Sequence, residues 1–110
     1  MSVRLVAAAA IAFVAGIVVA AETAATITVG QRGLVFTQSS ASLARGDRIV
    51  FTNEDDVIHN INIFGPGNDE STDIGLQKPG ATLTYRFDKA GSYRVRCNIH
   101  PSVKMAVTVR

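Results

Sequence analysis

Hydrophobic and polar residues alternate with a period of two along most of the chain after residue 22. The clearest example is the segment 92–97, in which Tyr93, Val95 and Cys97 are separated by two arginines. Because successive side chains of a β-strand point to opposite faces, this pattern predicts a strand with one buried face. Seven segments rich in β-branched and aromatic residues are predicted as strands: 25–29, 34–37, 48–52, 59–64, 82–87, 92–97 and 105–109.

Turn-forming residues separate these segments, and helical periodicity is almost absent. Glycine, proline, asparagine and aspartate are concentrated in the intervals 45–47, 53–56, 65–69, 78–80 and 88–91. Short strands at this spacing predict an all-β fold, and we expect a Greek-key β-sandwich of about seven to eight strands.

The longest interval, residues 65–80, has no clear strand pattern. In a two-sheet Greek-key fold one connection crosses between the sheets, and this interval is the candidate for it. We expect a single helical turn around residues 73–76. Ile74 and Leu76 are expected to pack against the core or to border the functional site.

The N-terminal segment has a different composition from the rest of the chain. One positive charge, Arg4, precedes a run rich in Ala, Val and Ile that ends in small residues just before Glu22. This is the layout of a secretory signal peptide, so we expect residues 1–21 to be cleaved and residues 22–110 to form one periplasmic or otherwise exported domain. An uncleaved anchor is the alternative, because ~17–25 apolar residues can span a membrane. After cleavage no membrane span would remain.

Charge and motif content narrow the classes of function. The chain has 11 Lys and Arg against 9 Asp and Glu, a formal net charge of +2, so a nucleic-acid partner has no electrostatic support. No Ser/His/Asp set, paired carboxylates or phosphate-binding loop is visible in the sequence, which argues against an enzyme. Arg86, Arg94 and Arg96 are expected to form a solvated basic stripe on one sheet face.

The most distinctive chemistry belongs to one cysteine and two histidines. Cys97 is the only cysteine, and metal ligation is one way in which an exported protein protects an odd thiol. Both Cys97 and His59 are predicted at the ends of strands, on their apolar faces. If those ends are neighbours, the turn through Pro101 brings His100 to the same point. A thiolate, two imidazoles and a weak thioether such as that of Met105 form the ligand set of a one-electron copper site.

Two segments resemble the plastocyanin/amicyanin-type cupredoxins. Residues 51–60 contain an acidic turn followed by a His-Asn pair, and residues 87–101 contain Gly-Ser-Tyr before Cys-x-x-His-Pro. The paired signature is specific, and the resemblance covers the whole domain. Within the family the chain looks most like small exported proteins labelled plastocyanin-like or methylamine-utilisation proteins. The resemblance implies a cupredoxin-like domain that binds one copper ion in a type 1 (blue) site.

The resemblance also implies a role for each residue of the site. His59, Cys97 and His100 match the three equatorial copper ligands. Asn60 matches a residue that ties the two ligand loops together and directs its backbone N–H at the thiolate, where such a donor tunes the metal. His100 matches the histidine whose ring edge reaches the surface. Redox partner proteins, such as a cytochrome, a dehydrogenase or an oxidase, would dock near His100.

The sequence leaves the axial ligand open between two residues. Plastocyanin-like members place a methionine five residues after the second histidine, which matches Met105. Amicyanin-like members with His-Pro place it three residues after, at Val103 in this chain, and the position of the last strand favours this shorter loop. With Val103 at the axial position the site would be three-coordinate or recruit a backbone oxygen, and the redox potential would change.

These residues together predict an electron carrier. Because both histidines would be occupied by copper, neither is available as a general base, and one copper without a second cofactor suits single-electron transfer between redox partners outside the cytoplasm. The alternative is a periplasmic copper-binding carrier without an electron-transfer role, which would hold exchangeable Cu(I). A structural sandwich without metal is a third hypothesis, which applies if His59 and Cys97 do not converge.

Overall fold

The computed structural model describes residue 16 and residues 23–110. The predicted signal peptide, residues 1–21, lies outside the described residues except for Gly16. Within the described part of the chain all regular structure is β, and no helix there is long and apolar enough to cross a membrane. The strands are β1 (Thr26–Gln31), β2 (Ser40–Leu43), β3 (Arg48–Asn53), β4 (His59–Phe64), β5 (Ser71–Gln77), β6 (Thr82–Arg86), β7 (Gly91–Arg96) and β8 (Lys104–Val109).

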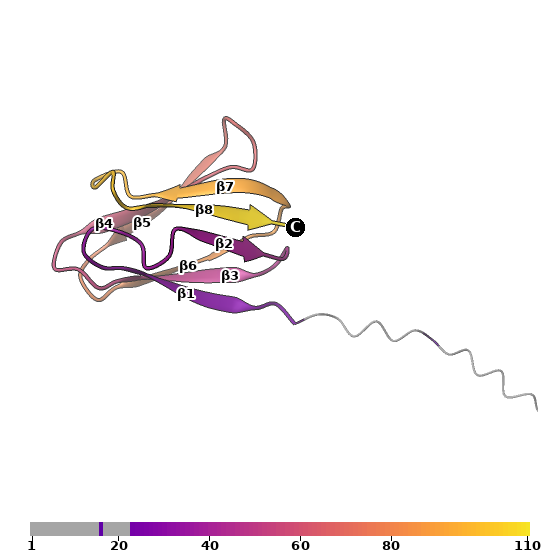
Figure 1. The fold of residues 1–110 in the computed structure, drawn as a ribbon, viewed down its shortest axis with the longest axis horizontal. Helices are drawn as coiled ribbons and strands as arrows, with labels where there is room; N and C mark the ends of the chain where they lie inside the picture. Colours follow the sequence, from indigo (N-terminus) through magenta and orange to yellow (C-terminus); the bar gives the residue numbers. More distant parts are fainter. Residues whose placement is uncertain (1–15, 17–22) are drawn as a thin grey trace, which may run out of the picture.

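The strands form two layers that pack face to face (Figure 1). One sheet has three strands in the order β1-β3-β6, and the other has five in the order β2-β8-β7-β4-β5. The β1–β3 and β2–β8 pairs are parallel and the remaining pairs are antiparallel. Because β1 and β2 lie in different sheets, as do β5 and β6, the chain crosses repeatedly between the layers. The prediction of an all-β sandwich of about seven to eight strands is confirmed.

Alternating side chains fill the space between the two sheets. In β8, for example, Met105, Val107 and Val109 are buried while the residues between them are exposed. Phe51 and Phe87 are the largest fully buried side chains. Burying a side chain of this size contributes about 1.5–3 kcal/mol to folding, so the apolar interior is the main source of stability.

The register of β4 and β7 decides where the functional residues meet. These strands are antiparallel, and Asn62 of β4 is opposite Arg96 of β7. The first residue of β4, His59, therefore lies at the same end of the sheet as Cys97, the residue that follows β7. The turn from β3 into β4 and the loop from β7 into β8 also lie at this end (Figure 1). We refer to it below as the copper end.

The prediction for residues 65–80 is wrong in its second half. Residues 71–77 form β5, which pairs antiparallel with β4, instead of a helical turn. The sequence does not show the regular alternation of a strand here, because the pairing of β5 with β4 shifts register between Ile61 and Asn62. Gly75 in β5 also has a φ of 123°, which is outside the extended conformation of a regular strand. Ile74 packs against the core as expected, but Leu76 is 68% exposed and lies on the outer face.

The prediction of a strand at residues 34–37 is also wrong. Leu34 has a φ of 59°, which takes the backbone out of the extended region, and only an isolated bridge joins Phe36 to Gln31. The strand forms instead at Ser40–Leu43, where small residues gave no hydrophobic signal. The other six predicted strands agree with the structure to within two residues at each end.

The predicted basic stripe is divided between the two sheets. Arg94 and Arg96 lie on β7 in the five-stranded sheet, whereas Arg86 ends β6 in the three-stranded sheet and pairs with Asp88 at 2.7 Å. Alternation within one strand shows which residues share a face, but it does not show which strands share a sheet.

Candidate metal centre

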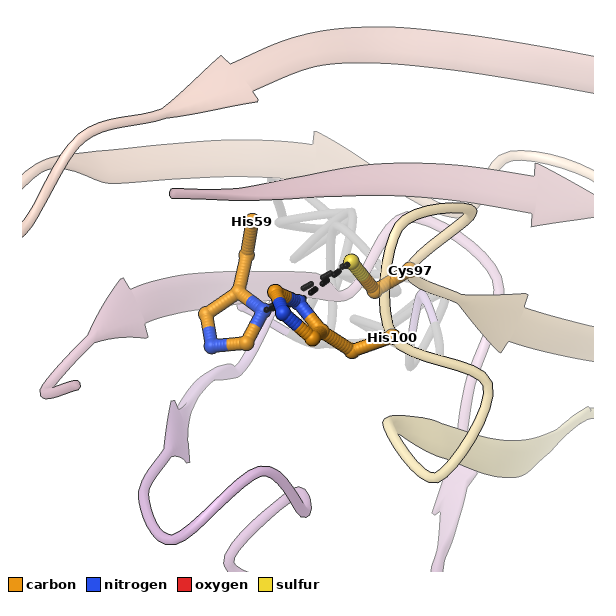
Figure 2. Close-up of side chains that lie close together, drawn as sticks. All are labelled: His59, Cys97 and His100. Carbon is orange, nitrogen blue, oxygen red and sulfur yellow. Dashed lines mark hydrogen bonds between the residues drawn. The ribbon is translucent and has the colours of Figure 1, made fainter. Parts of the chain in front are cut away.

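Three segments bring one cysteine and two histidines together at the copper end. His59 begins β4 and is completely buried, Cys97 directly follows β7 and is 2% exposed, and His100 lies in the loop before β8. Figure 2 shows the three side chains pointing toward one another. Their ligand atoms all lie within 4.8 Å of one another. The convergence on which the copper hypothesis depends is therefore present.

The spacing of the donor atoms fits a single first-row transition metal. Cys97 Sγ is 3.5 Å from His59 Nδ1 and 4.0 Å from His100 Nδ1, and the two Nδ1 atoms are 3.2 Å apart. A triangle with these sides has a central point roughly 2 Å from each corner, close to the ~2.0–2.3 Å typical of metal bonds to His nitrogen and Cys sulfur. One soft sulfur and two imidazole nitrogens are the donor set expected of copper.

Backbone hydrogen bonds close the loop that carries His100. The N–H of Cys97 donates to the carbonyl of Val103 at 2.9 Å, and the N–H of Val103 donates to the carbonyl of His100 at 2.9 Å. The loop is therefore a compact turn that continues the β7–β8 ladder. This geometry holds the His100 ring beside the Cys97 thiol.

Asn60 connects both ligand segments to β5. Its backbone N is 3.4 Å from Cys97 Sγ, and its side-chain oxygen accepts a hydrogen bond from the N–H of Asn98 at 2.6 Å. Its side-chain nitrogen donates to Asp73 Oδ2 at 3.2 Å. A backbone donor directed at the sulfur withdraws electron density from it, which tunes the potential of a bound metal.

The second ring nitrogen of His59 contacts a carboxylate that we did not assign from the sequence. His59 Nε2 is 2.8 Å from Asp55 Oδ2, and the same carboxylate accepts hydrogen bonds from the N–H groups of Gly33 and Leu34. Burial alone would raise the pKa of Asp55, but these hydrogen bonds outweigh it and hold the pKa below its ordinary value. An acidic residue four positions before a ligand histidine was the available sequence signal.

Buried amides support the strand ends behind His59. Gln77 is paired with His59 across β4 and β5, and its side-chain nitrogen donates to the carbonyls of Phe51 and Ala81. Its side-chain oxygen accepts a hydrogen bond from the buried Gln31. Asn53, also buried, donates to the carbonyls of Val57 and Gln77, at 2.8 and 3.0 Å. These directional bonds fix the ends of three strands around the site.

The two candidates for the axial position are both buried, at different depths. Val103 is directly opposite Cys97, because the β7–β8 register pairs Arg96 with Lys104 and the next hydrogen bond joins Cys97 to Val103. Met105 is opposite Val95, one inward-facing pair further into the core.

Most of the large exposed hydrophobic side chains of the described residues lie in the loops of the copper end. They belong to the loops between β1 and β2, between β3 and β4, and between β7 and β8. The first and last of these loops are joined by a hydrogen bond from Ser102 Oγ to the carbonyl of Leu34 at 2.6 Å. The His100 side chain itself is partly exposed. The side chains are Leu34, Val35, Val57, Ile58 and Ile99, and we call them the apolar surface.

Solved structures share this fold at low sequence identity. A Cu(I) structure of an amicyanin variant aligns with a TM-score of 0.70 and 22% identity, over 81% of this chain and 87% of that chain. A purple cupredoxin from Nitrosopumilus maritimus gives a TM-score of 0.67 and 21% identity, over 76% and 99%. A copper-containing nitrite reductase from Thermus scotoductus gives 0.68 and 24%, over 77% of this chain but only 22% of the enzyme.

A comparison with models of protein families assigns the chain to a family, which the shared fold alone does not do. A search of curated proteins found no match to the chain. The family described as copper binding proteins, plastocyanin/azurin family, matches residues 22–110, which include the whole sandwich and the His59, Cys97 and His100 cluster. The resemblance noted in the sequence is confirmed, and this chain belongs to the plastocyanin/azurin family of copper-binding proteins.

Proposed function

We propose that this protein is a type 1 copper protein that carries single electrons between redox partners outside the cytoplasm. The observation that carries the proposal is the convergence of the buried Cys97 thiol with the Nδ1 atoms of the buried His59 and the partly exposed His100, in a chain of a copper-binding family. Copper bound there would supply a one-electron couple. The protein residues hold the three donors, keep water from the sulfur and limit rearrangement during electron transfer.

The rigidity of the site favours electron transfer over copper delivery. A copper carrier needs donors that open and exchange, whereas the sulfur here is almost completely buried and the His100 loop is closed by two backbone hydrogen bonds. With both histidines at the metal, the site also has no free imidazole for acid–base catalysis. We therefore assign the protein as an electron carrier and not as an enzyme.

Electrons would enter and leave through His100. The Nδ1 atom of His100 is 4.0 Å from the Cys97 sulfur, and the His100 side chain is partly exposed. The side chains of the apolar surface lie around it. A small apolar contact area suits weak and rapidly exchanging redox complexes, which typically bury less than ~1,200 Å² in total. A cytochrome, dehydrogenase or oxidase would dock on this surface.

In this proposal Val103, and not Met105, would be the residue beside a bound copper on its axial side, while Met105 packs in the core. Support comes from the strand register: side chains directly opposite in an antiparallel pair are ~4.5–5.5 Å apart at Cβ, whereas diagonal neighbours are ~7–8 Å apart. Val103 is the direct neighbour of Cys97. Met105→Leu should therefore leave the visible spectrum unchanged, and Val103→Met should shift it. A changed spectrum in Met105→Leu would return the axial role to Met105.

Export depends on residues 1–21, which we propose are a cleaved signal peptide. The supporting observations are the single charge at Arg4, the apolar run and the small residues before Glu22. Expression of the full chain in a bacterial host, followed by fractionation and N-terminal mass determination, tests this. A periplasmic protein that begins at Glu22 supports the proposal, and an intact chain in the membrane fraction contradicts it.

The deciding experiment is a titration of the purified protein with Cu(II), followed by reduction with ascorbate and reoxidation. A type 1 site gives an intense visible band, from thiolate-to-copper charge transfer, that bleaches and returns. Cys97→Ala should lose this band completely. Tight Cu(I) binding without the band would indicate a copper carrier instead, and failure to bind either oxidation state would exclude both functions.

A further inference from the structure

The two ring nitrogens of His59 face different groups. Nδ1 faces Cys97 and His100, while Nε2 is 2.8 Å from the Asp55 carboxylate. A neutral imidazole carries its proton on one nitrogen only, and a carboxylate acceptor beside Nε2 selects the form in which Nδ1 has a free lone pair. The contact therefore prepares the nitrogen that faces the thiol for metal ligation. His59 is fully buried, so solvent does not compete for this bond.

The Asp55 carboxylate is itself fixed by the backbone of a distant segment. Oδ1 accepts from the N–H of Gly33 at 2.6 Å, and Oδ2 accepts from the N–H of Leu34 at 3.1 Å. Consecutive N–H groups that converge in this way form a concave site for an anion. Both residues have positive φ, 66° and 59°, a conformation that is unfavourable for leucine. The negative charge of Asp55 compensates for this backbone conformation.

The same segment reaches the loop of the second histidine. The carbonyl of Leu34 accepts a hydrogen bond from Ser102 Oγ at 2.6 Å, and Ser102 stands two residues after His100. Asp55 is also held through its own N–H, which donates to Asn53 Oδ1 at 3.0 Å. One chain of hydrogen bonds therefore links His59 to the loop that carries His100 without passing through the metal position.

We propose that Asp55 is a positioning residue of the copper centre, which orients His59 and favours Cu(II) over Cu(I) by placing a fixed negative charge behind the ring. The inference rests on the proposed function, because it concerns the same site. A carboxylate bonded to a ligand histidine strengthens the histidine as a donor, and loss of such partners typically costs ~10–100-fold in metal affinity. The more highly charged Cu(II) state loses more than Cu(I) when the charge is removed.

Asp55→Asn is the principal test, because an amide oxygen can still accept the His59 hydrogen bond while the charge is lost. Asp56→Asn is the matched control: it removes the same charge one residue away, from an exposed side chain, where solvent and salt screen the effect. We expect Asp55→Asn to lower the ratio of Cu(II) to Cu(I) affinity about tenfold, which raises the one-electron potential by about 59 mV. The control should change the ratio less than about twofold.

A second measurement needs no bound copper, and its main result comes from the parent protein alone. Nitrogen-15 NMR of the metal-free parent protein reports which ring nitrogen of His59 carries the proton, and we expect Nε2, with slow exchange because Asp55 accepts from it. Asp55→Ala should speed this exchange. Protonation of Nδ1 in the parent overturns the orienting role. Equal potentials in Asp55→Asn and Asp56→Asn overturn the electrostatic role.

The tests separate this inference from the proposed function. If the parent protein binds Cu(II) without a type 1 band, the proposed function fails, while the tautomer measurement still tests the Asp55 contact. If the parent shows the band but the Asp55 and Asp56 variants behave alike, the proposed function stands and the inference about charge fails.

Discussion

The two ends of the sandwich are stabilised by different interactions. Among the described residues, five of the six buried polar side chains lie at the copper end, at the ends of β1, β3 and β5 and the start of β4: Gln31, Asn53, His59, Asn60 and Gln77. At the opposite end, aromatic rings of Tyr85, Phe87 and Tyr93 meet edge to face, with centroids 4.8 and 5.1 Å apart.

This difference follows from what each end has to do. Hydrophobic burial stabilises the fold but has no direction, whereas a hydrogen bond fixes the relative position of two atoms. A metal site needs donors at defined positions, and the copper end therefore uses buried amides although they are expensive to desolvate. Two buried side-chain oxygens, Oε1 of Gln31 at this end and Oδ1 of Asn62 further along β4, have no hydrogen-bond partner. We expect the opposite end to govern stability and the copper end to govern the metal.

Phe87→Ala should have the largest effect on stability. Phe87 is fully buried and contacts both Tyr85 and Tyr93 edge to face, so its loss leaves a cavity at the end away from the metal. We expect a loss of about 3–5 kcal/mol in urea unfolding, with the visible spectrum of the folded copper protein unchanged. Phe64→Ala, a half-exposed site in β4, is the control and should cost much less. A shifted copper band in Phe87→Ala would show that the two ends are not independent.

Gln77→Ala should have a smaller effect on stability and a visible effect on the copper. The change leaves the buried Gln31 side-chain amide without its Gln77 partner, which costs about 1–3 kcal/mol, and it also removes one hydrogen bond to the Phe51 carbonyl. Because Gln77 is paired with His59, we also expect the copper spectrum to move. Gln38→Ala removes an exposed amide and should change neither quantity. An unchanged spectrum in Gln77→Ala would mean that the amides support only the fold.

The strands missed in the sequence are the two edges of the five-stranded sheet, β2 and β5. Central strands such as β7 bury alternate large residues and are recognisable from the pattern alone. An edge strand has only one neighbour, so it needs less burial: β2 buries only Leu43 completely, and β5 only Gln77. Their formation depends on pairing with β8 and β4, which local sequence does not encode.

In the metal site, too, the residues that belong to short sequence motifs could be predicted, whereas a residue whose contacts come from a distant part of the chain could not. His59, Cys97, His100 and Asn60 could be placed from sequence because short motifs carry them, and the structure brings all four together. Asp55 was given no role, although it was part of the acidic turn. Its role depends on backbone N–H groups more than 20 residues earlier in the chain, and a backbone donor has no side-chain identity to recognise.

Tyr93→Phe tests the end away from the copper with a smaller change. The Tyr93 hydroxyl donates to the carbonyl of Lys89 at 2.6 Å and closes the turn between β6 and β7. Its removal should cost about 1 kcal/mol at neutral pH and leave the copper band in place. Burial raises the pKa of Tyr93 above its usual value of 10.0, so the parent loses stability as pH rises through the unfolded value, whereas the variant has no such proton. The difference between the proteins should therefore shrink above pH 10.0. A constant difference across this range would contradict the role of the hydroxyl.

Asp47→Asn should have the smallest effect, and it compares most directly with Asp55. Each aspartate accepts hydrogen bonds from two backbone N–H groups, but Asp47 lies before β3 and holds Ala25 and Ala44, far from His59. These bonds lower the pKa of Asp47 below 3.8. The stabilisation is therefore complete above pH 3.8 and is lost as pH falls through the folded value. Thermal unfolding of the copper-free parent and variant should differ slightly at pH 7 and converge at acid pH, and both should have the same potential when loaded with copper. A potential that moved as in Asp55→Asn would show that the total charge of the protein, and not the position of Asp55, controls the metal.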